Sequence, residues 1–225
     1  MFAVSVLSLS VILPTLNEAD TIASTLHSLE SVASISVVDG GSTDETLAHI
    51  APGQASVIRC EEPGRARQMN RGAAESEGEL LLFLHADTRV PAEALERMQR
   101  EMSDRPELVG GGFLRRFDSD SLFLRMTCRL ADWRSRRLGL FLGDQGIFVR
   151  RSVFETMGGF DETMTVGEDL DFSYRMTRLG PTLAAAPPVR SSARRFEEKG
   201  AIRQTWEDYR TARNLLREIR QKEEA

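Results

Sequence analysis

A histidine and an aspartate, two residues apart, directly follow a long apolar run. The run Leu80-Leu81-Leu82-Phe83-Leu84 is typical of a buried strand in a parallel sheet, and it stops at His85-Ala86-Asp87. Side chains alternate along a strand, so His85 and Asp87 are expected to point the same way, at the sheet edge where α/β folds bind ligands. Imidazole and carboxylate suit Mn²⁺ or Mg²⁺ held together with a substrate diphosphate. The alternative is that Asp87 only caps a helix that starts near Pro91.

Polar loops also follow two earlier apolar runs. Asp39-Gly40-Gly41 forms a tight turn with room for a planar ligand, where Asp39 could accept an N–H from a nucleobase or bind a ribose hydroxyl. The alternative is a turn that Asp39 itself stabilises. The first run ends in Pro14-Thr15-Leu16-Asn17-Glu18, where a Rossmann dehydrogenase would carry a glycine-rich loop, and Asn17 or Thr15 could cap a helix there. Three polar loops at one sheet edge favour a ligand site over three independent turns.

Two further charged pairs occur late in the chain. Glu168 and Asp169 follow Gly167, where a helix is expected to begin, and carboxylates at a helix start are stabilised by the helix dipole without any catalytic role. Arg194-Arg195 follows the last expected strand and could approach a diphosphate, although such a pair is more often solvated surface. Each pair therefore has a structural and a functional interpretation.

The order of the apolar segments predicts the framework that must position these residues. We expect buried strands at Leu7–Leu13, Ile35–Val38, Ser56–Cys60, Leu80–Leu84, Val109–Phe117, Gln145–Arg150 and Thr182–Ala186. We expect helices at Glu18–Ser31, Thr43–His49, Arg65–Glu75, Ala92–Met102, Leu122–Leu138, Asp169–Leu179 and Ile202–Gln221. Alternating strands and helices predict an α/β fold with a mostly parallel sheet covered by helices on both faces. Pro187-Pro188 is expected to end the last strand.

Four segments, taken together, resemble one family. PTLNE, VVDGGSTDET, GRARQMNRGAAESEGELLLFLHADT and GGFDETMTVGEDLDFSYRMTRLG occur in the order expected of a family 2 glycosyltransferase of GT-A fold, from about Ser8 to Gly180. The resemblance implies transfer of a sugar from a nucleotide diphosphate donor, with a UDP-sugar expected, to an acceptor hydroxyl. It also implies inversion at the sugar and usually a requirement for Mn²⁺ or Mg²⁺.

The resemblance also assigns roles to residues by their positions. The donor nucleotide is expected to contact Pro14, Asn17, Glu18, Asp39, Arg65, Asn70, Ala86 and Arg194. Among these, Asp39 would bind the base, commonly uracil. Asp87 would be the metal-binding member of the DxD-type motif, with His85 as a second ligand that replaces the usual Asp and so removes a negative charge. Asp169 would be the catalytic base, next to Glu168.

Composition and domain size limit the remaining possibilities. The chain has 225 residues and a net charge of −5 with mixed charges, which gives no argument for nucleic-acid binding. We expect a transferase domain over residues 1–200, with a nucleotide-binding half at 1–105 and an acceptor or catalytic half at 106–200, followed by a helical tail at 201–225. Cys60 and Cys128 show no metal-type spacing and are expected as reduced thiols. The apolar N-terminus lacks a basic signal-peptide start, so we expect a cytoplasmic protein.

The acceptor is left open by the sequence. Resemblance to the family fixes neither the donor sugar nor the acceptor, which could be lipid-linked or a glycan. Arg134, Arg136 and Arg137 beside the apolar segment 138–142 could form a surface that touches the inner face of a membrane, or only the basic outer face of a packed helix. The tail helix, with an apolar stripe that includes Ile202, could serve a homodimer contact, a membrane surface or intramolecular packing.

Two other functions are kept as alternatives. A sugar-phosphate nucleotidyltransferase has a similar nucleotide-binding half, but it would be expected to show a glycine-rich basic loop where this chain has Pro14-Thr15-Leu16-Asn17-Glu18. A non-catalytic nucleotide-binding protein is suggested only by the histidine at position 85. A panel of nucleotide ligands would discriminate among the three.

Overall fold

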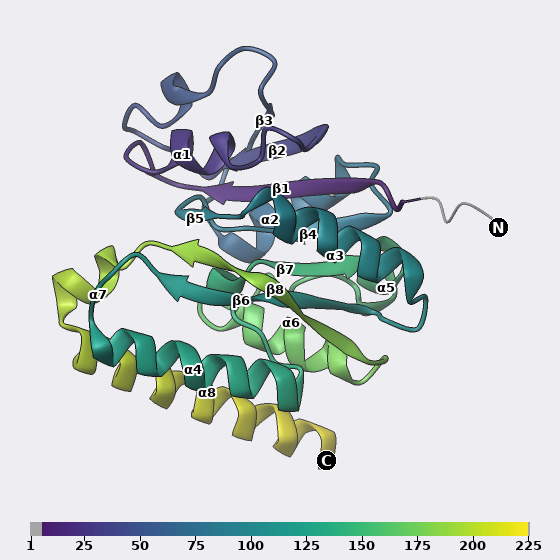
Figure 1. Cartoon of the computed structure of the whole chain (residues 1–225), viewed down its shortest axis with the longest axis vertical. Helices are drawn as coiled ribbons and strands as arrows, with labels where there is room; N and C mark the ends of the chain where they lie inside the picture. Colours follow the sequence, from purple (N-terminus) through teal and green to yellow (C-terminus); the bar gives the residue numbers. More distant parts are fainter. Residues whose placement is uncertain (1–5, 225) are drawn as a thin grey trace.

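One eight-stranded sheet forms the centre of the molecule in the computed structural model, which describes residues 6–224 (Figure 1). The strands are β1 (Leu9–Thr15), β2 (Ser34–Asp39), β3 (Ser56–Arg59), β4 (Leu80–Phe83), β5 (Thr88–Arg89), β6 (Gly110–Phe117), β7 (Ile147–Arg150) and β8 (Thr182–Ser191). Their order across the sheet is β3-β2-β1-β4-β7-β6-β8-β5. The predicted apolar N-terminus extends into residues 1–5, which lie outside the described residues.

The first four strands form a parallel half, as predicted. β1 pairs with β2 on one side and with β4 on the other, and the register sets Thr15 opposite Asp39 and Ile12 opposite Phe83. Parallel strands end at the same sheet edge, so the polar loops that follow β1, β2 and β4 gather there. The predicted α/β class with a mostly parallel sheet is therefore confirmed.

The second half of the sheet is mixed. β7 runs antiparallel to both β4 and β6, whereas β8 runs parallel to β6 and antiparallel to β5. The prediction that Pro187-Pro188 ends the last strand is wrong, because β8 continues to Ser191. The two prolines coincide with a register shift on β6 between Phe113 and Arg115, where the ladder is interrupted and a missing N–H is tolerated.

Helices cover both faces of the sheet. They are α1 (Ile22–His27), α2 (Arg65–Ala74), α3 (Ala92–Asp104), α4 (Leu122–Leu138), α5 (Arg151–Met157), α6 (Glu168–Thr177), α7 (Arg194–Lys199) and α8 (Ala201–Glu224), with short 3-10 helices η1 (Leu47–His49) and η2 (Gly143–Gln145). α1 and α3 pack against Leu80 and Leu82 of β4, while α2, α5 and α6 pack against Leu81 and Phe83 of the same strand. This division follows from the alternation of side chains along a strand.

Some local elements differ from the sequence prediction. α1 starts at Ile22 rather than Glu18, because Asn17 adopts a left-handed backbone with φ of 54° and its loop turns before the helix begins. Only the 3-10 turn η1 forms within the helix expected at Thr43–His49. β5, α5 and α7 were not predicted at all.

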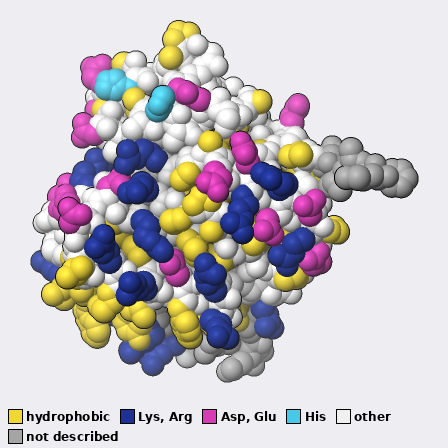
Figure 2. Space-filling view, viewed as in Figure 1, with side chains coloured by type: hydrophobic (Ala, Val, Ile, Leu, Met, Phe, Trp, Pro, Cys, Tyr) yellow, Lys and Arg dark blue, Asp and Glu magenta, His cyan; other side chains and the backbone are white. Residues whose placement is uncertain are grey.

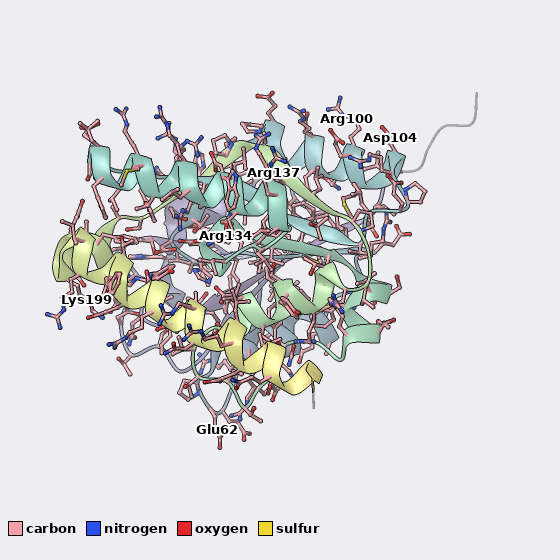
Figure 3. The ribbon with its side chains drawn as sticks, turned by 90° about the horizontal axis from the view of Figure 1, so that it is seen from below. Glu62, Arg100, Asp104, Arg134, Arg137 and Lys199 are labelled. Atoms are coloured by element: carbon pink, nitrogen blue, oxygen red, sulfur yellow. The ribbon has the colours of Figure 1, made fainter. Side chains whose placement is uncertain are left out.

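The lower side of the molecule in Figure 1 carries α4 and α8. Arg134 of α4 does not belong to the basic outer face that was predicted: its guanidinium turns inward and donates to the Leu140 carbonyl at 3.2 Å and to the Gln145 side chain. Figure 3 accordingly shows Arg134 between α4 and α8, and Arg137 on the part of α4 away from α8. Among residues 6–224, no helix combines the length and the apolar character that crossing a bilayer requires.

Candidate functional site

The loops that follow β1 and β2 are joined by hydrogen bonds. The Asn17 side-chain oxygen accepts from the Thr43 N–H at 2.9 Å, and the Asn17 N–H donates to the Ser42 hydroxyl at 2.9 Å. The Glu18 N–H donates to the Thr46 hydroxyl at 2.8 Å. Asn17 makes its contacts with Ser42 and Thr43 from a left-handed backbone conformation. These loops form one preorganised wall at the carboxyl edge of the sheet, which we call the loop wall.

Asp39 lies at the base of the loop wall and is 3% exposed. Its carboxylate accepts from the Gly41 N–H at 3.1 Å and from the Ser42 N–H at 3.2 Å, so it does stabilise its own turn. Sequence reasoning missed Gln68 on α2, whose side-chain nitrogen donates to the Thr15 and Val38 carbonyls at 3.0 and 2.7 Å. This buried amide ties the ends of β1 and β2 together.

Asp87 faces an open pocket of about 300 Å³. The pocket is lined by Thr21, Ser24, Asp87, Arg89, Asp118, Ser192, Ala193, Arg194 and Glu197. Arg194 also forms an ion pair with Glu18 at 3.1 Å, which raises the pKa of the guanidinium. Burial raises the pKa of Asp87, the Glu18 charge raises it further, and Arg194 opposes both. The Asp87 carboxylate and the Arg194 guanidinium therefore share this pocket.

His85 does not point the same way as Asp87, which corrects the prediction. β4 ends at Phe83, and the turn at Ala86 and Asp87 breaks the strand alternation on which that prediction depended. His85 instead continues on the Phe83 face, in a small cavity of about 10 Å³. Burial lowers the pKa of His85 to about 3, and Arg65 contributes, so the imidazole is neutral at pH 7. Its Nε2 atom is buried without a hydrogen-bond partner.

Asp169 closes the same small cavity from the start of α6. One carboxylate oxygen accepts from the Gly143 N–H at 2.6 Å and the other from the Leu170 N–H at 2.7 Å. A Cβ atom placed on Gly143 would lie 2.3 Å from His85 Nε2 and 3.3 Å from the Asp169 carboxylate, so these two groups face each other across Gly143. Burial raises the pKa of Asp169 and the adjacent Glu168 charge raises it further, against the backbone hydrogen bonds and Arg65.

The other predicted residues lie around these two pockets. Arg65 donates to the buried Glu168 carboxylate at 3.1 Å and is half exposed, with its guanidinium at the cavity that holds Asp169. Asn70 holds the backbone N–H and carbonyl of Phe160, both at 2.9 Å, so its amide supports the loop before α6. Ala86 is buried and its carbonyl accepts from the Thr25 hydroxyl at 2.7 Å. Pro14 lies in β1, half-buried beside the loop wall.

Sequence reasoning missed an ion pair at the centre of the site. Asp144 of η2 pairs with the buried Arg115 of β6, and the Asp144 Oδ1 and Arg115 Nε atoms have no hydrogen-bond partner. Burial alone would raise the pKa of Asp144, but the Arg115 guanidinium outweighs it and the pKa is lowered. The only sequence signal was a polar pair, Asp144-Gln145, set between glycines directly before a buried strand. We call Arg115, Asp144, His85 and Asp169 the buried cluster.

The carboxylates of the site do not form a metal cage by themselves. Among the described side chains, those of residues 6–219 and 221, no group of three or more His, Cys, Asp or Glu residues is arranged to hold a metal ion. A divalent ion could therefore bind here only with few protein ligands and with oxygen atoms from a substrate. That is the mode Mg²⁺ adopts beside substrate phosphates.

A family model and several relatives match this sequence. The model for glycosyl transferase family 2 matches residues 10–158. A PGL/p-HBAD biosynthesis glycosyltransferase of Mycobacterium bovis is 35% identical over 192 residues, which covers 74% of this chain and 68% of that protein. Glycosyltransferase AglE of Haloferax volcanii is 29% identical over 203 residues, covering 80% of this chain and 64% of AglE.

Solved structures share the fold at low sequence identity. The mannosyltransferase PcManGT from Pyrobaculum calidifontis, determined with GDP-Man and Mn²⁺, superposes with a TM-score of 0.66 at 22% identity and covers 84% of this chain. TarS from S. aureus superposes with a TM-score of 0.63 at 20% identity and covers 82%; a shorter TarS was determined with UDP. This chain spans 57% of the PcManGT chain and 36% of the full TarS chain.

Proposed function

This chain belongs to glycosyl transferase family 2, and from that premise we propose that it transfers a sugar from a nucleotide diphosphate donor to an acceptor hydroxyl with inversion. The observation that carries the proposal is the Asp169 carboxylate, half-buried at the start of α6 and fixed on both oxygens by backbone N–H groups. A carboxylate fixed in this way can deprotonate a hydroxyl at one defined position. The loop wall lies at the same sheet edge and supplies the part of the site that binds the nucleotide of the donor.

Asp169 acts as the general base in this proposal. Its raised pKa makes it a stronger base than an exposed aspartate. The two backbone hydrogen bonds restrict its rotation, so the acceptor hydroxyl is approached from the cavity side. Glu168 is engaged by Arg65 and acts as a positioning residue that also raises the basicity of Asp169.

The loop wall binds the nucleoside, and we infer that the base is uracil. Asp39 has a carboxylate with about four acceptor sites, of which its own turn uses those facing Gly41 and Ser42, so a base N–H can still be accepted. PcManGT and TarS were determined with GDP-Man and with UDP respectively, so guanine is the competing base. Asn17 and Glu18 form the border of this subsite through their contacts with the second loop.

The diphosphate lies in the open pocket between Asp87 and Arg194. Arg194 is 43% exposed and reaches the pocket from α7, so it can exchange its contact with Glu18 for a phosphate oxygen. The residues fit a divalent cation held by Asp87 together with the diphosphate, because Asp87 is a partly desolvated carboxylate beside an open volume. When bound, Mn²⁺ or Mg²⁺ would neutralise charge on the leaving diphosphate. His85 faces the other pocket, so the metal proposal depends on Asp87.

Product analysis tests this function directly. The protein is incubated with UDP-sugars or GDP-sugars and Mn²⁺, with water as the default acceptor, and the released nucleotide is identified by chromatography. Release of the nucleoside diphosphate, UDP in the favoured case, supports glycosyl transfer. Release of pyrophosphate on incubation with a nucleoside triphosphate and a sugar phosphate would identify a nucleotidyltransferase instead.

A binding panel separates failure of the donor assignment from failure of the fold assignment. Thermal unfolding is followed with UDP, GDP and their diphospho-sugars, each with Mn²⁺ and with EDTA. At a hundredfold excess over Kd, a ligand should stabilise the fold by about 2.7 kcal/mol. Stabilisation by GDP but not by UDP would replace uracil with guanine and leave the rest of the proposal standing. Equal stabilisation with Mn²⁺ and with EDTA would exclude a role for the metal in donor binding.

A further inference from the structure

The outer surface of α4 has an unusual composition. Its exposed positions hold only apolar residues and arginines: Leu122, Arg125, Met126, Arg129, Leu130, Trp133, Arg136, Arg137 and Leu138. The opposite side of the helix is buried, with Leu124, Cys128 and Ala131 inside. α4 is thus anchored by its inner side, and the apolar side chains outside it are not needed to hold the helix in place.

The exposed apolar residues form one continuous stripe. Leu122, Met126, Leu130 and Trp133 follow one another at steps of four, four and three residues, the spacing that aligns side chains on a helix. They are between 52% and 76% exposed. Figure 2 shows hydrophobic side chains gathered along α4 at the lower edge of the molecule, with Lys and Arg side chains among them. Monomeric surfaces seldom expose such a patch without a partner.

The charge on this surface has one sign. Arg125, Arg129 and Arg136 run along one flank of the apolar stripe. The carboxylate of α4, Asp132, is mostly covered and pairs with Arg116 at 2.9 Å, so it does not offset the arginines. An apolar stripe with a flank of arginines is the composition of helices that lie in the interface of an anionic bilayer.

We propose that α4 docks this protein on an anionic lipid bilayer. The stripe from Leu122 to Trp133 enters the boundary between headgroups and acyl chains, and Trp133 suits that boundary because its indole combines an apolar body with a polar N–H. The flanking arginines reach lipid phosphates while their methylene stems cover apolar surface. The proposal concerns a surface contact only and does not depend on the donor, the metal or the reaction.

A second copy of this chain fits the same surface poorly. A two-fold dimer brings the same patch of each copy together, and this patch would oppose arginines to arginines with no carboxylate between them. The exposed stripe on α8, formed by Ile202, Trp206 and Tyr209, differs in this respect. It lies beside side chains of both signs, because Glu207 pairs with Arg203 and Asp208 pairs with Arg195, so its surroundings lack the single positive sign of the α4 surface. The lipid surface therefore favours α4 over α8.

The docked helix would lie beside the open pocket. Asp118 lines that pocket together with Asp87, and the chain then runs directly to Ser121, whose hydroxyl accepts from the Leu124 N–H at 3.4 Å at the start of α4. Figure 3, which looks at the molecule from below, shows α4 and α8 together on this side. Docking through α4 would thus hold the rim of the pocket next to the membrane surface.

Vesicle co-sedimentation tests the proposal on the full chain. The probes are vesicles of phosphatidylcholine alone and vesicles enriched in phosphatidylglycerol, each at low and high salt. We expect binding to the anionic vesicles that weakens as salt rises. Trp133→Ala should reduce that partitioning about tenfold, as expected for loss of one large buried side chain. Replacing Arg125, Arg129 and Arg136 by Gln should reduce it about fivefold for each arginine.

Trp206→Ala is the matched control, because Trp206 on α8 is 65% exposed and Trp133 is 60% exposed. Circular dichroism and thermal unfolding verify that each variant is folded. An equal loss from Trp206→Ala and Trp133→Ala would overturn the assignment to α4. Absence of binding to anionic vesicles, or a dimer in light scattering that Trp133→Ala dissociates, would overturn the lipid proposal.

Discussion

The two walls of the site satisfy their polar groups in opposite ways. In the loop wall, Asn17, Asp39 and Thr46 each have hydrogen-bond partners within the protein. In the buried cluster, polar atoms of His85 and Asp144 are enclosed yet unpartnered. Of the five buried atoms without a partner among the side chains of residues 6–219 and 221, three belong to this cluster.

The difference indicates which part of the site is preorganised for ligand binding and which part lowers the stability of the folded state. Paired loops hold their shape whether or not a nucleotide is present, which reduces the ordering cost of binding. Enclosed polar atoms without partners cost free energy in the folded state, and native proteins keep them mainly where function requires them. We therefore expect changes in the buried cluster to affect turnover and stability strongly, and changes in the loop wall to affect nucleotide affinity more gently.

Asp169→Asn should produce the largest effect. The amide cannot accept a proton, so turnover should fall by ~10²–10⁴-fold, the usual contribution of a positioned general base. Nucleotide affinity should stay nearly unchanged, because the loop wall is separate from the cavity. Steady-state kinetics and a titration with UDP measure the two quantities.

Asp171→Asn is the matched control for this change. Asp171 lies in the first turn of the same helix, but its carboxylate is used by Arg175 at 2.7 Å rather than by the cavity. The turnover of Asp171→Asn should remain close to that of the unchanged protein. Full activity in Asp169→Asn would move the base elsewhere, and Glu168 would be the first residue to test by Glu168→Gln.

Asp144→Asn should cause the largest loss of stability. The change leaves the buried Arg115 guanidinium without its counter-charge, and breaking a buried pair from one side typically costs ~3–5 kcal/mol. Chemical denaturation measures the free energy of unfolding. The double variant Arg115→Met with Asp144→Asn should recover part of the loss. A double variant no more stable than Asp144→Asn alone would show that the pair is not the origin of the effect.

Gly143→Ala should disturb both members of the cluster that face it. The added methyl group would lie 2.3 Å from His85 Nε2, so the imidazole or the η2 turn must move, at a cost of ~1–3 kcal/mol. The displaced turn also carries the N–H that holds Asp169, so turnover should fall along with stability. Gly64→Ala is the control, because a methyl group there meets its first neighbour, in Arg67, at 3.8 Å. Similar losses in both variants would contradict the crowding at His85.

Asp39→Ala should weaken UDP binding about tenfold, a loss of ~1.4 kcal/mol, with little change in turnover at saturating donor. The carboxylate contributes one contact to the base, while Asn17 and Thr46 still hold the loops together. Calorimetric titration with UDP measures the affinity. Unchanged affinity would mean that Asp39 only stabilises its own turn, through its hydrogen bonds with the Gly41 and Ser42 N–H groups.

The sequence predicted the loop wall better than the buried cluster, for a physical reason. The loop wall follows strands of the parallel half, each a local apolar run joined to its neighbours by short crossovers, so the order of elements along the chain fixes their place. The buried cluster joins β6, η2, the end of β4 and the start of α6, which are far apart in the sequence. β4 and β6 are neighbours of the same strand, β7, which pairs antiparallel with both. Long-range pairing of this kind leaves no local periodicity.

His85 illustrates the limit most clearly. The apolar run predicted its strand correctly, but a strand end one residue earlier and a turn at Ala86 were enough to separate it from Asp87. Asp144 and Arg115 carried no recognisable motif, since a lone polar pair between glycines is typical of any turn. The family resemblance was stronger than either signal because it combined four segments in one order.

The smallest expected effect is on the pH dependence of stability. Asp169→Asn should lose turnover, yet its stability relative to the unchanged protein should improve as the pH rises. The pKa of Asp169 is raised in the folded state, so the carboxyl group favours folding below its ordinary pKa of 3.8 and opposes it once the pH exceeds the raised value. The amide carries no charge at any pH. It also accepts on one atom only, so one of the N–H groups of Gly143 and Leu170 loses its partner at every pH.

The difference in unfolding free energy between the two proteins should therefore shift in favour of Asp169→Asn as the pH rises from below 3.8 to neutrality, on top of a constant cost from the lost hydrogen bond. Denaturant titrations of both proteins at acidic and neutral pH measure this shift, with Asp171→Asn as the control. A difference that does not change with pH, or that shifts against Asp169→Asn, would mean that burial does not raise the pKa of this carboxyl group. The strength of Asp169 as a base would then have to come from the acceptor-bound state alone, because the free protein would hold an ordinary aspartate.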